Sequence, residues 1–170
     1  MTDIASKSVP WRIRRERCAL VVIDMQNDFL KPGGALYYKD APMKAVPHIK
    51  RLADYCRLAA LPVLYTQTLL ADTFSISPLE VSYQPVLKDL GLRSGTWGSE
   101  IIDELEPLPD EPVIVKHRYD AFYNTNLDVV LKNIRGMGTV DTLIITGTVT
   151  NVCCESTARA AFMRDYKVVF

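Results

Sequence analysis

The sequence lacks any run of about 18 apolar residues, the minimum that a membrane-spanning helix needs. Residues 1–10 are polar and lack the apolar stretch of a secretory signal. Its 20 basic residues are balanced by 20 acidic ones, so no net field attracts the chain to nucleic acid or to an anionic membrane. We therefore expect no nucleic-acid or membrane partner.

Cysteine and histidine are also scarce, with four and two residues respectively. Cys18, Cys56, Cys153 and Cys154 are too few and too scattered for a disulfide framework, and no C-x-x-C pair is present. So few histidines make a zinc site unexpected. We predict no metal, no cofactor, and thiols that stay reduced in the cytoplasm.

Short apolar runs alternate with longer amphipathic segments along the 170 residues, and a 48% hydrophobic content suffices for a sizeable core. No internal repeat or Gly/Ser linker divides the chain, so we predict a single domain over residues 1–170. Five of the runs are rich in β-branched residues and nearly unbroken, as in strands with both faces covered. They occupy residues 18–24, 62–68, 112–117, 142–149 and 167–170.

Helical spacing of apolar residues marks 47–60 and 124–138, and a third helix is expected to begin near Thr150 or Asn151, both good N-caps. Residues 72–98 are less regular and predict a long connection of the kind that often shapes a site. Alternating strands and helices predict a three-layer α/β/α fold with a mostly parallel sheet and Rossmann-like topology. Ligands of such sheets bind beyond the carboxyl ends of the strands.

Three chemically capable side chains lie at predicted strand ends, although they are far apart in sequence. Asp24 follows the first strand, Lys116 ends the third, and Cys153 comes just after the fourth. Together they predict a hydrolytic site in which the thiol attacks, the carboxylate takes its proton and the lysine holds nearby charge. Each also has an ordinary explanation: a turn aspartate, a lysine that extends to water, and a cysteine that only packs.

The adjacent Cys153 and Cys154 raise the question of which thiol is reactive. In the first turn of the helix, free amides and the helix dipole are expected to lower the pKa of Cys153. Cys154 is rotated by about 100° from it on a regular helix, so the two thiols cannot face one point. We expect Cys153 to attack and Cys154 to pack.

The segments "VVIDMQNDF", "KHRYDAFYNTNLD" and "TGTVTNVCCESTARAAF" resemble, in this order, the three signature blocks of the isochorismatase-like cysteine hydrolases. The resemblance runs from about Cys18 to Phe170 and implies the isochorismatase-like fold. It implies that Asp24 is the general base, that Lys116 matches the family's lysine, and that Cys153 is the nucleophile. Since the family usually continues past the fifth strand, it also implies that the C-terminal strand and helix segment is missing here.

The family resemblance implies two further features of the nucleophile turn. One is a cis peptide bond between Thr148 and Val149. The other is an oxyanion hole formed by the backbone amides of Val149 and Cys153. Family resemblance also favours a homo-oligomer in which a neighbour closes the pocket.

The family contains several chemistries. Isochorismatases proper lack the cysteine that is present here, which favours cleavage of an amide. The nicotinamidases hold a metal through an Asp/His cluster after the second strand, but the matching "YTQTLLADTFS" has no histidine. The closest resemblance is to the ureidoacrylate and N-carbamoyl amidohydrolase branch, which cleaves linear amide or ureido C–N bonds through an acyl-enzyme. A nicotinamidase-type amidase and a catalytically silent scaffold of the same fold are the alternatives.

Aromatic and polar residues near the strand ends are candidates for lining the substrate pocket. For any one of them, packing in the core is an equally good explanation. The candidates are Phe29, Gln67, Trp97, Tyr119 and Phe122.

Overall fold

Five parallel strands form one sheet in the order β3-β2-β1-β4-β5. The computed structural model describes residues 11–39, 42–71, 75–136 and 139–170. The expectation of a mostly parallel sheet is confirmed. The strands are β1 (Cys18–Ile23), β2 (Val63–Thr68), β3 (Val113–Lys116), β4 (Thr142–Gly147) and β5 (Lys167–Val169).

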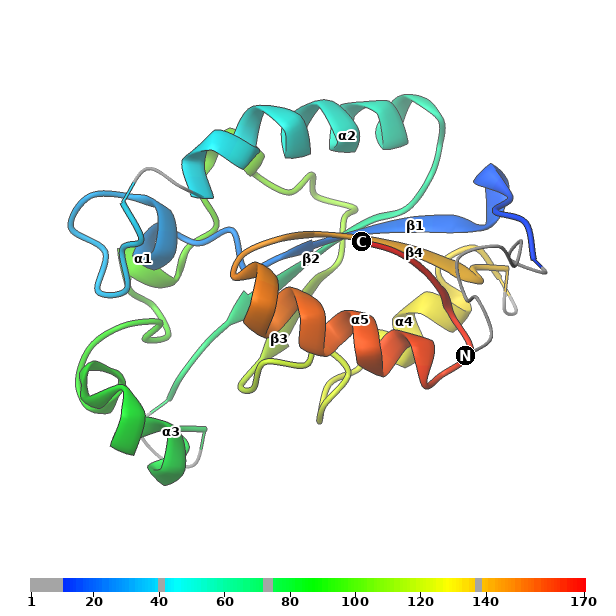
Figure 1. Cartoon of the computed structure of the whole chain (residues 1–170). Coiled ribbons are helices and arrows are strands. Elements are labelled where there is room, and N and C mark those ends of the chain that lie inside the picture. Colours follow the sequence, from blue (N-terminus) through cyan, green and yellow to red (C-terminus); the bar gives the residue numbers. More distant parts are fainter. Residues whose placement is uncertain (1–10, 40–41, 72–74, 137–138) are drawn as a thin grey trace, which may run out of the picture.

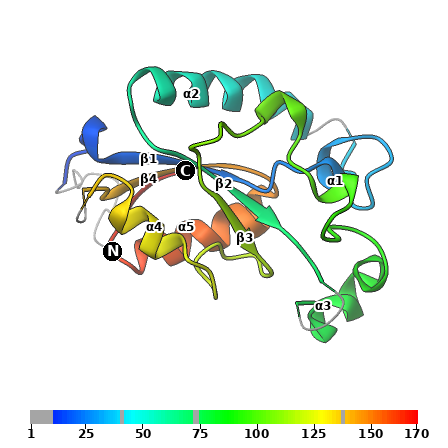
Figure 2. The ribbon, with the colours of Figure 1, turned by 180° about the vertical axis from the view of Figure 1, so that it is seen from behind.

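Helices cover both faces of this sheet, which confirms the three-layer arrangement (Figures 1 and 2). One face packs against α2, and the opposite face packs against α4 and α5. The segments that carry α1 and α3 extend beyond one end of the sheet. The helices are α1 (Asn27–Leu30), α2 (Val46–Leu58), α3 (Pro78–Tyr83), α4 (Leu127–Asn133) and α5 (Glu155–Phe162).

The central strand β1 explains why the sheet needs two helical layers. All six of its residues are buried. Leu20 and Val22 belong to the hydrophobic cluster under α2, whereas Val21 and Ile23 belong to the cluster under α4 and α5. Alternate side chains of one apolar strand therefore enter two separate cores.

Two sequence expectations differ from the structure in detail. The third strand was expected to be covered on both faces, but Val113 and Val115 are 39% and 42% exposed because β3 is an edge strand. The nucleophile segment begins with a π-helical turn over Thr150–Cys154 rather than with a regular helix. No helix within the described parts of the chain is long and apolar enough to cross a membrane.

The ends of β1 and β4 approach closely at Gly147. This residue has φ +128°, and a Cβ atom added there would lie 2.1 Å from the carbonyl oxygen of Ile23. The amide of Thr148 then donates to the same oxygen at 2.9 Å. The peptide bond between Thr148 and Val149 is cis, as the family resemblance implied. Glycine is therefore needed to bring the turn after β4 against the end of β1.

We predict that Gly147→Ala destabilises the fold by at least about 2 kcal/mol, because it adds a backbone clash to an unfavourable φ. Gly33→Ala is the matched control, since Gly33 also has a positive φ of +94° but open space around its Cβ position. Urea denaturation of both variants measures the difference. Equal losses would contradict the close approach of β1 and β4.

Candidate active site

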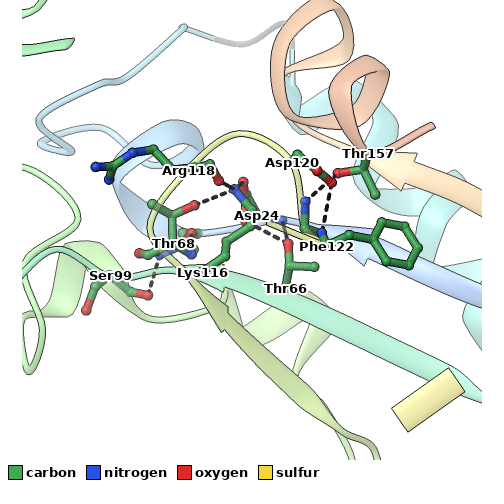
Figure 3. Close-up of polar contacts among 11 residues, drawn as sticks. Asp24, Thr66, Thr68, Ser99, Lys116, Arg118, Asp120, Phe122 and Thr157 are labelled. Atoms are coloured by element: carbon green, nitrogen blue, oxygen red, sulfur yellow. Dashed lines mark hydrogen bonds and ion pairs between the residues drawn. The ribbon is translucent and has the colours of Figure 1, made fainter. Parts of the chain in front are cut away.

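The carboxyl ends of three strands bring the predicted residues to one edge of the sheet. Asp24 follows β1, Lys116 is the last residue of β3, and Cys153 lies in the π-helical turn after β4. β2 lies between β1 and β3, so Asp24 and Lys116 come from strands that are not neighbours. Their side chains therefore meet across the end of β2 (Figure 3).

Asp24 and Lys116 form a fully buried ion pair. The Lys116 ammonium lies 2.6 Å from Oδ2 of Asp24, and both side chains are 0% exposed. Lys116 also donates to the hydroxyl of Thr68 at 2.8 Å and to the carbonyl oxygen of Arg118 at 2.9 Å. The lysine does not extend to water, so the ordinary explanation for a strand-end lysine does not apply here.

Thr66 of β2 fixes the other oxygen of Asp24. The Asp24 amide donates to Thr66 Oγ1 at 3.1 Å, and Thr66 Oγ1 donates to Asp24 Oδ1 at 2.7 Å (Figure 3). Both residues are 0% exposed, and Asp24 has the left-handed φ of +48°. Oδ1 is thus occupied by Thr66, while Oδ2 accepts no hydrogen bond beyond its ion pair with Lys116 among the described contacts.

The Cys153 thiol lies beside this ion pair and is 6% exposed. Burial raises its pKa, as does the Asp24 carboxylate, while Lys116 acts in the opposite direction. The expectation of a lowered pKa is therefore wrong, because burial and the neighbouring carboxylate outweigh the helix terminus. Burial also opposes the charge of Lys116, but Asp24 and Cys153 reverse this and raise its pKa. The resting site thus holds a neutral thiol next to a charged pair.

Cys154 is buried with the apolar residues between the sheet and α5. Burial and the Asp24 carboxylate raise its pKa to about 12. Unlike Cys153, Cys154 is not among the residues that line the adjacent cavity. This agrees with the expectation that the second thiol of the pair packs.

The turn after β4 offers backbone donors next to the thiol. The amides of Val152 and Cys154 donate to the carbonyl oxygen of Val149, at 3.1 Å and 3.2 Å. These bonds close the turn without using the amides of Val149 and Cys153. Those two amides are the donors that the family resemblance implies for an oxyanion hole, and both residues line the cavity.

A cavity of about 150 Å³ opens on the side of Cys153 and Lys116 that faces α3. Its wall is mostly apolar, as is typical of a small-molecule site. The polar groups in it come from the ends of β2 and β3, from the segment after β3 and from the α3 region: Thr68, Glu80, Gln84, Lys116, His117 and Arg118. Tyr119, whose pKa is raised to about 12 by burial and by hydrogen bonding to Glu80, connects the β3 side of the cavity with α3. Of the predicted lining residues, Phe29 and Tyr119 are in the wall.

The structure does not bring the other three predicted residues to this cavity. Gln67 donates to the carbonyl oxygen of Ser99 at 2.7 Å and holds the loop before β3. Trp97 is 52% exposed on that loop. Phe122 points into the core below the sheet, where its ring stacks with Tyr166 at 6.0 Å.

Sequence reasoning missed Thr66, Thr68 and Glu80, which surround the ion pair or line the cavity. Threonine within a strand is usual, and its spacing gives no sign of a hydrogen-bond partner 40 or more residues away. Glu80 lies on α3, within the segment that we predicted only as an irregular connection.

The part of the chain that the structure describes contains no group of three His, Cys, Asp or Glu side chains placed to hold a metal ion. Part of the stretch that corresponds to the metal cluster of nicotinamidases, residues 72–74, lies outside the described residues.

The sequence of this chain is similar to that of known proteins. The model of the Isochorismatase domain matches residues 18–170. The chain is 31% identical to the ureidoacrylate amidohydrolase RutB of Agrobacterium fabrum, over 96% of this chain and 77% of that protein. It is 32% identical to the RutB of Caulobacter vibrioides, over 96% of this chain and 78% of that protein.

Solved structures agree with these sequence matches. A cysteine hydrolase from Pseudomonas syringae superposes with a TM-score of 0.85 at 37% identity, covering 96% of this chain and 74% of that one. An N-carbamoylsarcosine amidase from Thermoplasma acidophilum has a TM-score of 0.76 at 32% identity, covering 89% of this chain and 79% of that one. With its five-stranded parallel sheet and a domain match that spans nearly all of the sequence, the chain belongs to the isochorismatase family.

Proposed function

We propose that this chain is a cysteine-dependent amidohydrolase that cleaves a linear amide or ureido C–N bond of a small molecule through an acyl-enzyme. The observation that carries the proposal is the fully buried Asp24–Lys116 ion pair next to Cys153 at the wall of a small, mostly apolar cavity. Burying an ion pair costs desolvation energy, so a fully buried pair in a cavity wall is a candidate for a functional role. A thiol beside a carboxylate is suited to nucleophilic catalysis.

The relatives support the same bond type. Ureidoacrylate amidohydrolases and an N-carbamoylsarcosine amidase are among the similar proteins, and both names denote enzymes that act on carbon–nitrogen bonds of ureido compounds. A hydrolase of non-peptide C–N bonds is therefore the function that fits both the family and the side chains at the site.

In the first half of the proposed reaction, the Cys153 thiol gives its proton to Oδ2 of Asp24 as its sulfur forms a bond to the substrate carbonyl carbon. The raised pKa of the thiol means that this transfer accompanies the attack rather than preceding it. The negative oxygen that develops accepts hydrogen bonds from the amides of Val149 and Cys153. As the proton moves between the sulfur and the Asp24 carboxylate, the Lys116 ammonium stabilises the negative charge on either group.

When the tetrahedral intermediate collapses, the C–N bond breaks and ammonia leaves with the proton that Asp24 had taken. A thioester to Cys153 remains. Asp24 then takes a proton from water, whose oxygen attacks the thioester carbon. The C–S bond breaks, the sulfur regains the proton from Asp24, and the acid product is released.

Two properties stay predictions for this chain. One is a cytoplasmic location, and the other is assembly as a homo-oligomer. Light scattering coupled to gel filtration measures the oligomeric state directly.

We predict that Cys153→Ala lowers kcat for ammonia release at least about 1,000-fold, because the bond-forming atom is lost. Cys154→Ala is the matched control and is expected to retain activity within about tenfold, since this thiol packs away from the cavity. The assay follows ammonia from ureidoacrylate, N-carbamoyl amino acids, biuret and nicotinamide. Similar losses in the two variants would mean that the cysteine pair is structural. Nicotinamide as the best substrate would instead favour a nicotinamidase-type amidase.

We also predict that Asp24→Asn increases the rate at which iodoacetamide alkylates Cys153 near pH 8, although it abolishes turnover. The Asp24 carboxylate raises the thiol pKa, so its neutralisation lowers that pKa and increases the thiolate fraction. Peptide mass spectrometry separates Cys153 from the other thiols. Slower alkylation in Asp24→Asn than in the unmodified chain would show that Asp24 activates the thiol in the resting state.

A further inference from the structure

The hydrogen bonds of Thr68 determine the direction in which its hydroxyl group can donate. Thr68 is the last residue of β2, is 8% exposed, and lines the cavity beside Cys153. Its Oγ1 atom lies 2.8 Å from the Lys116 ammonium. An ammonium group has only donors, so Thr68 must accept this bond.

The hydroxyl proton of Thr68 is therefore not used by Lys116. The other hydrogen bonds of this residue are made by its backbone: its amide donates to Oε1 of Gln26 and its carbonyl oxygen accepts from Nε2 of Gln26, both at 2.9 Å. This pair of bonds fixes the main chain and leaves the hydroxyl as the one remaining donor of Thr68. Among the described residues no hydrogen bond donated by this hydroxyl is found, and Thr68 is part of the cavity wall.

The position of this donor limits which part of a substrate it can reach. Lys116 bonds Thr68 and interacts with Cys153, so its ammonium is a shared neighbour of the Thr68 hydroxyl and the attacking sulfur. The candidate oxyanion donors, Val149 and Cys153, come from the β4 side of β1, whereas Thr68 comes from the β2 side. Because β1 separates the two sides, this arrangement favours an acceptor next to the attacked carbonyl over the carbonyl oxygen itself.

We propose that Thr68 is a specificity-determining residue that donates its hydroxyl proton to an oxygen acceptor on the substituent of the substrate's ureido nitrogen. The inference rests on the proposed function and narrows its substrate class. Ureides whose substituent carries a carbonyl or carboxylate oxygen near that nitrogen, such as acylureas and ureido acids, are favoured over plain alkylureas. A substrate without this oxygen leaves a buried donor unpaired, and such a site rejects it.

The test compares N-acetylurea with N-ethylurea, which differ by one carbonyl oxygen at the relevant position. Thr68→Val keeps the shape of the side chain and removes the hydroxyl. It is expected to lower kcat/KM for N-acetylurea about tenfold more than for N-ethylurea, and Thr68→Ser is expected to restore the preference. Any disturbance of Lys116 changes kcat/KM for both compounds alike. The ratio of the two kcat/KM values therefore reports on the hydrogen bond that Thr68 donates.

Thr157→Val is the matched control, because Thr157 has a buried hydroxyl that accepts from the Ala121 amide and does not line the cavity. It is expected to leave the ratio unchanged. An equal loss for both ureides in Thr68→Val would overturn the proposal and leave Thr68 only as a support for Lys116. Unchanged kcat/KM values for both ureides in Thr68→Val would overturn it as well.

A binding measurement separates this proposal from the proposed function. In the Cys153→Ala variant, calorimetry or ligand-detected NMR is expected to find N-acetylurea bound about tenfold more weakly when Thr68 is also replaced by valine, with N-ethylurea unaffected. Hydrolysis of neither compound by the unmodified chain would count against the proposed function, while the binding ratio still decides the role of Thr68. A Cys153→Ala variant that binds neither ureide would overturn both.

Discussion

The ion pair between Asp24 and Lys116 joins the ends of two strands that do not pair with each other. Removing each of these charges from water costs on the order of several kcal/mol, unless hydrogen bonds from the surrounding residues compensate. Here β2 supplies the compensation, because Thr66 bonds the carboxylate and Thr68 bonds the ammonium. The geometry of the site therefore depends on a strand that contributes no group to the proposed bond-breaking steps.

Burial and the same carboxylate set the resting state of the thiol. Burial raises the pKa of Cys153 most, the Asp24 carboxylate raises it further, and Lys116 acts against both. In the proposed mechanism, the neutral thiol and the charged pair form a stable resting arrangement, and the proton moves only when a carbonyl carbon is available. This differs from cysteine hydrolases that store a preformed thiolate.

The fold and the three proposed catalytic positions were predictable from the sequence because each rests on a local pattern. The apolar run of β1 predicted a strand buried on both faces, and the strand-end rule brought Asp24, Lys116 and Cys153 to one edge. The hydrogen-bond partners were not predictable, because Thr66 and Thr68 look like ordinary strand residues. The aromatic residues were a partial guide: Phe29 and Tyr119 line the cavity, whereas Phe122 turns into the core, since its ring has Tyr166 to pack against. The sign of the thiol pKa shift depended on burial and on a neighbour distant in sequence, which a helix-terminus rule does not include.

In the proposed mechanism, Cys153 forms a covalent acyl intermediate with the substrate. Rapid acid quenching of the unmodified chain with its best ureide, followed by intact-protein and peptide mass spectrometry, tests this most directly. The proposed mechanism predicts a transient adduct on Cys153 equal in mass to the substrate less ammonia, decaying at the rate of turnover. Turnover without such an adduct, or an adduct on Cys154, would contradict it.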